Sequence, residues 1–251
     1  MDSSLIHHIF QQVSSAANRY YAWFAALHTR VDVLFLGPQS EAEFSAIVES
    51  VYKCLVEVER MGNRFSPDSE LSLAVAQAHL RPVVLTPSLA SLLHRCLKAN
   101  EETQGLFDIT INTPDHTPQT IHDVVITPEG HLSLRRPGIV LDLSGILKGY
   151  ALECLRPKLL ASGITDALIN LGNSSILVLG SACPDIPSGH CLTTSAGAPP
   201  ERRHIRHPMT GQYVPPFRRI SVLTKDGIEG EIQSIVSLLV SMPCGLTKDV
   251  L

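Results

Sequence analysis

Residues 124–151 carry the sequence pattern that most clearly indicates the fold class. Its first part reads V-V-I-T-P-E-G-H-L-S-L over 124–134, where two strand-like runs flank a Pro-Glu-Gly turn and predict a β-hairpin. Its second part reads I-V-L-D-L-S-G-I-L-K-G-Y-A over 139–151. It predicts a strand over 139–143, a glycine turn, and a helix that continues to Gly163 and kinks or restarts at Pro157. Alternation of hairpin with helix favours an α+β fold over a doubly wound parallel sheet.

The flanking sequence adds further elements of both kinds. Ser40 and Glu43 form a capping box before apolar residues at helical spacing, which predicts a helix that stops at Gly62 as its C′ residue. Thr86 followed by Pro87 opens another helix, and Asp68 or Ser69 caps a short one between them. Residues 4–28 predict a helix, and a last amphipathic helix covers residues 228–239. Strands are expected over 31–36, 82–85, 167–170, 176–179 and 220–223, whereas 181–203 is rich in Pro, Gly and Ser.

Length and composition narrow the class of protein. The chain has 251 residues, and 20 Lys and Arg against 24 Asp and Glu give a formal net charge of −4, which disfavours a nucleic-acid binder. There is no run of 18 apolar residues, so no membrane span is expected, and the N-terminus resembles neither a signal peptide nor a lipoprotein leader. The six cysteines form no C-x-x-C pair, which favours reduced thiols and a cytoplasmic location. We expect one domain over 1–251, whose halves could form two subdomains that meet at a cleft.

Five segments carry residues suited to ligand chemistry. Free N–H groups at the start of the helix near Lys148 favour an anion, and Lys148 adds a positive charge. Phe65, in an N-R-F-S-P-D-S-E-L-S loop, can offer a ring face to a planar ligand. Asp108 and Thr110 share one face of an extended segment. The loop T-T-S-A-G over 193–197, followed by H-I-R-H-P-M-T-G over 204–211, clusters hydroxyls, histidines and an arginine. The fifth is Glu231, on the last helix.

Each segment also has an ordinary structural explanation. The lysine turn can be a tight connection with a solvated side chain, and the phenylalanine loop a capped loop. The aspartate and threonine can hydrogen-bond their own turn, and the histidine-rich loop can be plain surface. A lone helix glutamate is usually a solvated charge. The common motifs for Walker phosphate loops, dinucleotide folds, zinc proteases and serine hydrolases are absent.

Taken in order, the segments resemble the FAD:protein FMN transferase (ApbE) family. The family carries F-x-P-D-S-E-[IL]-S, G-x-F-D-x-T and D-[LF]-[GS]-G-I-x-K-G-[YF]-A, which residues 65–72, 105–110 and 142–151 match. It also carries N-[LF]-G-G, T-S-G and H-I-x-[DN]-P-x-T-G, answered by 170–173, 194–197 and 204–211. Each motif alone is weak, but the ordered set covers the chain from Phe65 to about Met242.

The resemblance implies an ApbE-type α+β fold, with helices and antiparallel sheet around an FAD cleft. It implies a Mg²⁺-dependent enzyme that cuts FAD, attaches FMN by a phosphoester bond to a Thr or Ser of an acceptor protein, and releases AMP. His204 is the expected catalytic residue, and Glu231 with the Gly145 carbonyl the expected metal ligands. The expected FAD-binding residues are Phe65, Asp108, Thr110, Asp142, Ser144, Lys148, Ser195 and Thr210.

This sequence departs from the family pattern in five places. Gly230-Glu231 and Ile235 stand where the last helix usually carries A-D-x-x-x-T, and isoleucine supplies no oxygen to a metal. Asn173 replaces a glycine, and His207 replaces an Asp or Asn. The 180–193 segment is shorter than usual, and the sequence ends at Leu251, soon after the last predicted helix, where relatives usually add a strand. Two alternatives therefore stay open: an FAD-binding member that has lost transfer activity, and an α+β protein with chance matches.

Overall fold

A computed structural model describes residues 6–14, 17–37 and 40–242. Within these ranges a seven-stranded sheet has the order β1-β2-β3-β7-β8-β9-β10, and all neighbouring strands run antiparallel. A smaller antiparallel sheet has the order β4-β6-β5. The α+β prediction is confirmed. The strands are β1 Ile6–Ser14, β2 Ala17–Ala26, β3 Thr29–Leu36, β4 Val83–Val84, β5 Val124–Ile126, β6 His131–Leu134, β7 Ala167–Leu171, β8 Ser175–Leu179, β9 Cys191–Ala196 and β10 Arg219–Thr224.

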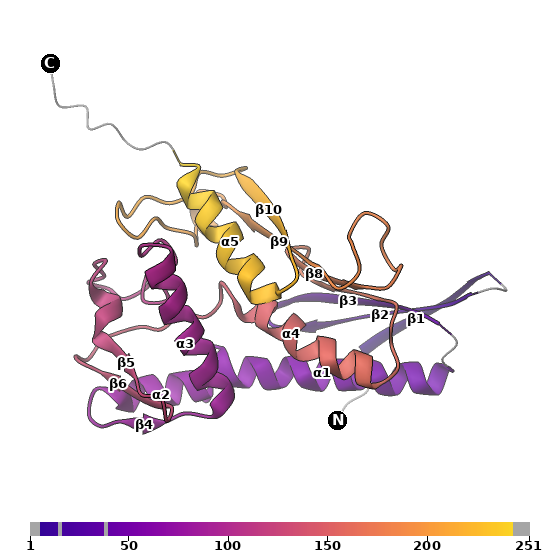
Figure 1. Cartoon of the computed structure of the whole chain (residues 1–251), viewed down its shortest axis with the longest axis horizontal. Coiled ribbons are helices and arrows are strands. Elements are labelled where there is room, and N and C mark those ends of the chain that lie inside the picture. Colours follow the sequence, from indigo (N-terminus) through magenta and orange to yellow (C-terminus); the bar gives the residue numbers. More distant parts are fainter. Residues whose placement is uncertain (1–5, 15–16, 38–39, 243–251) are drawn as a thin grey trace, which may run out of the picture.

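Three helices lie against the large sheet, and α4 lies between α1 and α5 and contacts both. α1 contacts α4 and strand β2, α4 contacts α5 and β8, and α5 contacts β9 and β10 (Figure 1). α2 and α3 lie at the other end of the molecule with the small sheet. The helix bounds are α1 Glu41–Gly62, α2 Glu70–Ala78, α3 Pro87–Glu102, α4 Leu147–Ala161 and α5 Gly227–Val240.

The helix starts follow the local signals in the sequence. Ser40 and Glu43 form the predicted capping box at α1, with the Glu43 carboxylate accepting the Ser40 backbone N–H at 2.7 Å. Ser69, rather than Asp68, caps α2, and Thr86 caps α3 with Pro87 at its first position. Gly62 is not a left-handed stop, however. It is the last helical residue, and a Cβ there would lie 2.5 Å from Leu147 Cδ2, so its role is close packing against α4.

The helix predicted over 4–28 is wrong. Residues 6–14 and 17–26 form strands β1 and β2, and residues 4, 5, 15 and 16 of this prediction lie outside the described residues. In β2 the buried side chains alternate at Ala22, Phe24 and Ala26, which is the period of a strand. A two-residue turn follows at Leu27 and His28, both with positive φ. Gly or Asn usually marks such a turn, and neither residue is present at 27 or 28, so no hairpin was predicted there.

Three further predictions need correction. The strand expected over 139–143 is wrong: these residues belong to neither sheet and form the irregular connection into α4. β9, Cys191–Ala196, lies inside the Pro-, Gly- and Ser-rich 181–203 segment, for which no strand was predicted. It pairs with β8 and β10, and every second residue along it is buried. α4 is one continuous helix through Pro157 rather than a restarted one. The hairpin β5–β6 and the helix α5 are confirmed.

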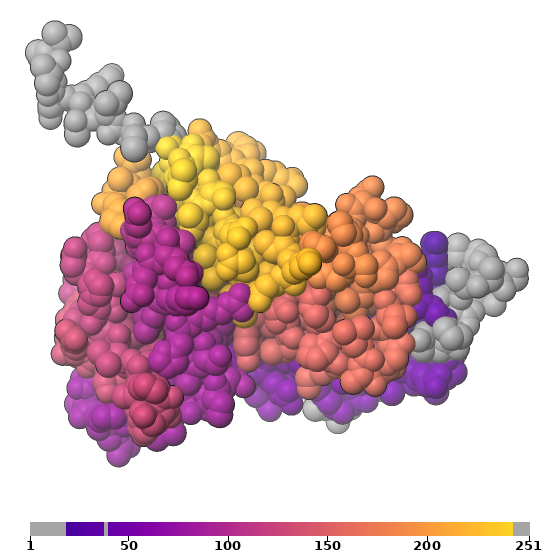
Figure 2. All heavy atoms as spheres, in the orientation of Figure 1, coloured from indigo at the N-terminus to yellow at the C-terminus, as the bar shows by residue number. Residues whose placement is uncertain are grey.

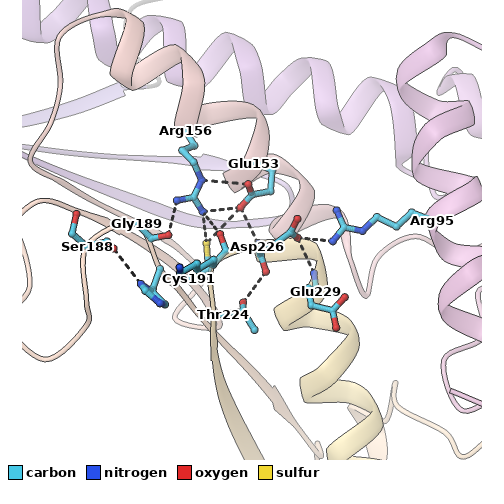
Figure 3. Close-up of polar contacts among 12 residues, drawn as sticks. Arg95, Glu153, Arg156, Ser188, Gly189, Cys191, Thr224, Asp226 and Glu229 are labelled. Atoms are coloured by element: carbon cyan, nitrogen blue, oxygen red, sulfur yellow. Dashed lines mark hydrogen bonds and ion pairs between the residues drawn. The ribbon is translucent and has the colours of Figure 1, made fainter. Parts of the chain in front are cut away.

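Helices α4 and α5 cross at two glycines, and this crossing positions the site. A Cβ on Gly149 would lie 2.3 Å from the Gly227 carbonyl oxygen, so the two backbones touch. The Glu153 carboxylate accepts the Gly227 N–H at 2.8 Å and pairs with Arg156, which also donates to the Lys225 carbonyl (Figure 3). α4 and α5 are thereby fixed relative to each other.

A second ion pair ties α3 to the start of α5. Arg95 pairs with Asp226 at 2.8 Å (Figure 3). In the space-filling view α5, in yellow, lies directly against α3, in magenta (Figure 2). No helix among the described residues is long and apolar enough to cross a membrane.

Candidate functional site

A cleft of about 790 Å³ opens where the α4 N-terminus, α5 and β9 meet the loops after α1 and α3. Most of the predicted site residues line it, although they span residues 65 to 231. These lining residues are Phe65, Asp108, Asp142, Ser144, Gly145, Lys148, Ser195, His204 and Glu231. Thr110 and Thr210 do not line it.

Lys148 stands in the first turn of α4, where the helix begins without a side-chain cap at Ile146. Its ammonium group donates to the Ser174 hydroxyl, and it is half-buried. No carboxylate of the described residues forms an ion pair with it. The Ile146 and Leu147 N–H groups already donate to the Leu143 carbonyl, and the Gly149 N–H donates to Glu231. The Lys148 ammonium, which has a hydroxyl partner but no carboxylate partner, therefore supplies the positive charge that favours an anionic ligand at this end of the cleft.

Asp142 is fully engaged by the protein itself. Its Oδ1 accepts from the Ser144 backbone and hydroxyl at 2.9 and 2.6 Å, and its Oδ2 accepts from Asn112 Nδ2 at 2.6 Å. Arg64 Nε lies 2.8 Å from the same Oδ2, an ion pair outside hydrogen-bond geometry. The carboxylate therefore fixes the loop before α4 and anchors Arg64.

Phe65 projects beside that ion pair. Its side chain is 64% exposed, and the Arg64 guanidinium lies over its ring at 4.0 Å. Such a cation on one ring face stabilises the orientation of the side chain. The exposed ring sits between the main cleft and a second cavity of about 530 Å³, whose far wall includes Leu27 and His28 of the β2–β3 turn.

Asp108 is buried and also committed to internal partners. Its Oδ1 accepts from the Thr110 backbone and hydroxyl at 2.7 and 2.6 Å, and its Oδ2 lies 2.8 Å from His116 Nε2. Thr110 is completely buried, so it secures this turn rather than facing the cleft. Asp108 and Thr110 thus hydrogen-bond within their own turn, and of the two only Asp108 lines the cleft.

The segment between β9 and β10 forms the opposite wall. His204 is exposed, with Nδ1 at 3.2 Å from the Arg202 carbonyl. The Ser195 hydroxyl lies 2.8 Å from that of Ser234 on α5 and is largely buried. Thr210 is exposed and accepts from the Gln212 N–H at 3.3 Å, away from the cleft.

Comparison with known proteins identifies the family. The sequence model of the ApbE family matches residues 27–190. The chain belongs to the ApbE family. It is 28% identical over 174 residues to an FAD:protein FMN transferase of Treponema pallidum, covering 59% of this chain and 48% of the relative. It is 22% identical over 167 residues to one of Vibrio cholerae, covering 57% and 50%. The match thus spans about half the length of these ApbE relatives.

Solved ApbE structures have the same fold. The flavin transferase ApbE from Vibrio cholerae superposes with a TM-score of 0.75 at 18% identity, over 89% of this chain and 87% of that one. The ApbE protein of Thermotoga maritima gives 0.72 at 18% identity, over 89% and 87%. The predicted ApbE-type fold is therefore confirmed, and the chance-match alternative is excluded.

The residues at the ApbE family's metal position do not fit a magnesium site. Glu231 is 4% exposed and accepts from the Ser175 hydroxyl at 2.5 Å. Burial raises the pKa of Glu231 to about 7, against the lowering effects of that hydrogen bond and the Lys148 charge. Ile235 Cδ1 lies 3.1 Å from where a Gly145 Cβ would be, so an aliphatic group covers Gly145. The described residues contain no cluster of three His, Cys, Asp or Glu side chains suited to a metal.

Arginine side chains are the residues of the cleft that the sequence analysis missed. The cleft is lined by four arginines: Arg64, Arg202, Arg203 and Arg206. Of these, the sequence predicted a ligand role only for Arg206, as part of the polar loop over 204–211. Arg206 donates across the cleft to the Ile111 carbonyl. Arginines carry no spacing signal, and only the folding of 197–213 over the 107–112 loop brings them together.

Proposed function

We propose that this ApbE-family chain is an FAD:protein FMN transferase, with FAD and an acceptor protein as its two substrates. One observation carries the proposal: residues that match five separate family motifs, including Phe65, Lys148 and His204, line a single cleft. A cleft of about 790 Å³ is in the size range of small-molecule sites. The Lys148 ammonium in this cleft has no carboxylate partner among the described residues, which suits the diphosphate of FAD.

The reaction is a phosphoryl transfer. The acceptor's Thr or Ser hydroxyl oxygen bonds to the phosphorus of the FMN half, while the bond from that phosphorus to the bridging oxygen breaks and AMP leaves. We assign His204 the hydroxyl proton, because it is an exposed imidazole on the cleft wall. Lys148 holds the diphosphate. The resemblance implies Mg²⁺ as well, but the donors at Glu231 and Ile235 do not fit it, so no step here runs through a metal.

A cytoplasmic location is part of the proposal. In the described part of the chain Cys54, Cys96, Cys154, Cys183 and Cys191 are all free thiols, and Cys244 lies outside it. Burial raises the pKa of Cys54 to about 11 and that of Cys191 to about 12, so these thiols are unreactive. Five unpaired cysteines favour a reducing compartment.

The test has a binding arm and a transfer arm. Calorimetric titration should give micromolar or tighter FAD binding, and Lys148→Ala should weaken it roughly 10- to 100-fold through loss of a charged hydrogen bond. Covalent flavin fluorescence on an acceptor protein, with the Vibrio cholerae transferase as positive control, measures transfer. His204→Ala should keep FAD affinity and slow transfer roughly 10²–10⁴-fold. Absence of FAD binding would overturn the proposal.

The substitution at Ile235 favours one second candidate, an FAD-binding member without transfer activity. Ile235 removes an oxygen ligand from the position where the family pattern has threonine, and a protein that no longer transfers FMN does not need that ligand. FAD binding without any labelled acceptor would select this candidate over the transferase.

A further inference from the structure

The cleft is positively charged although the chain is not. Five cationic side chains line it, against three carboxylates, whereas the whole sequence has 20 basic and 24 acidic residues. The cations are Arg64, Lys148, Arg202, Arg203 and Arg206, and the carboxylates are Asp108, Asp142 and Glu231. A local excess of positive charge in an acidic protein attracts an anionic ligand to this place.

The carboxylates of the cleft are all engaged, and most of its cations are not. Asp142 and Asp108 are held by the networks described above, and Glu231 accepts from Ser175. Among the described residues, only Arg64 of the five cations has an ion pair, with Asp142. Lys148, Arg202, Arg203 and Arg206 therefore keep an unneutralised charge at the cleft surface.

Arg206 is held in place before any ligand binds. It is half-buried, and its donation to the Ile111 carbonyl uses one of five guanidinium donors. A guanidinium that is already oriented loses less freedom on binding and presents a planar fork that matches phosphate oxygens. A magnesium ion beside Glu231 would find one buried carboxylate and the aliphatic side chain of Ile235.

We propose that this chain neutralises the diphosphate of FAD with its own cations, Arg206 and Lys148 first among them, and binds FAD without Mg²⁺. The inference rests on the proposed function, since it takes FAD as the ligand. Arg206 is the residue it adds: a specificity-determining side chain that separates ligands with a diphosphate from those without one.

The experiment measures FAD and riboflavin affinity by fluorescence titration, in excess EDTA and in millimolar MgCl2. We expect the same FAD affinity in both buffers. Arg206→Ala should weaken FAD binding roughly 10- to 100-fold in both and leave riboflavin, which lacks phosphates, unchanged. The FAD affinity of Arg206→Lys should lie between those of the parent and Arg206→Ala, because lysine keeps the positive charge but lacks the planar pair of guanidinium donors. Arg219→Ala, an exposed arginine on β10 outside the cleft, is the matched control and should behave as the parent.

The outcomes separate the two proposals. FAD binding that is lost in EDTA and restored by MgCl2 overturns metal-free binding and leaves the proposed function standing. Equal weakening of FAD and riboflavin by Arg206→Ala gives Arg206 a purely structural role and overturns its assignment. No FAD binding in either buffer overturns the proposed function itself. The Ile235→Thr variant sharpens the result, because it supplies the missing oxygen and should make FAD affinity respond to MgCl2.

Discussion

The two walls of the cleft differ in whether their charged side chains have partners within the protein. In the first wall, residues 107–112 and 142–144, every carboxylate is satisfied by neighbouring donors, as Asp108 is by Thr110 and His116. In the second wall, residues 194–206 with Glu231 and Ile235, the arginines form no ion pair with a described carboxylate, and the buried Glu231 accepts only from the Ser175 hydroxyl and the Gly149 N–H. The first wall is therefore a scaffold that the chain completes by itself. The second wall carries arginine charges without carboxylate partners, as a binding site for an anionic ligand requires.

The largest expected effect on stability comes from removing the Asp108 carboxylate of the first wall. Asp108→Ala leaves Thr110 and His116 without their buried acceptor and should lower the free energy of unfolding by about 3–5 kcal/mol. Urea denaturation measures the loss. Arg203→Ala, in the second wall, is the control, because the exposed arginine makes one contact with Tyr213 at 5.9 Å and should cost less than about 1 kcal/mol. Equal losses for the two variants would remove the distinction between the walls.

The next effect concerns pH and the second wall. The pKa of Glu231 is raised from 4.5 to about 7, so between these values the folded protein keeps a proton that the unfolded chain loses. Stability should therefore fall as pH rises from 4.5 to 7, by about 3 kcal/mol in total from this group, and level off above. Glu231→Gln should lack this component in EDTA-treated protein. Glu229→Gln, partly exposed on the same helix, should keep the parental profile, and parallel curves for all three proteins would contradict the prediction.

The smallest expected effect on stability comes from Gly149→Ala, at the contact between α4 and α5. In an open helix Gly→Ala would stabilise by about 1 kcal/mol through propensity alone. At Gly149 the new Cβ meets the Gly227 carbonyl and Glu231, so we expect a net loss of roughly 1–3 kcal/mol and weaker FAD binding. Thermal unfolding decides the sign. Ser91→Ala, exposed on α3, carries the propensity gain without the contact, and a similar gain at Gly149 would mean that the helices can separate cheaply.

Motif order predicted that Phe65, Lys148 and His204 share one cleft, and all three line the same cleft in the structure. Their roles in binding and catalysis stay predictions. Thr110 and Thr210 belong to the same motifs but serve their own turns. The difference depends on which way a side chain faces, and that is set by contacts with distant residues rather than by spacing.

Some features of the fold follow from interactions between neighbouring residues alone. The capping box at Ser40, the Thr86-Pro87 helix start and the Pro-Glu-Gly hairpin follow from hydrogen bonds and dihedral limits within a few residues, and all three formed as predicted. Other features depend on contacts with residues far along the chain, so they form only in the complete fold. β1 and β2 became strands because β3 pairs with β2, and β9 formed in a Pro/Gly/Ser-rich stretch because β8 and β10 lie beside it. The charge of the cleft is of the same kind: Arg206 gains its place only where the 197–213 segment folds back onto Ile111, 95 residues earlier.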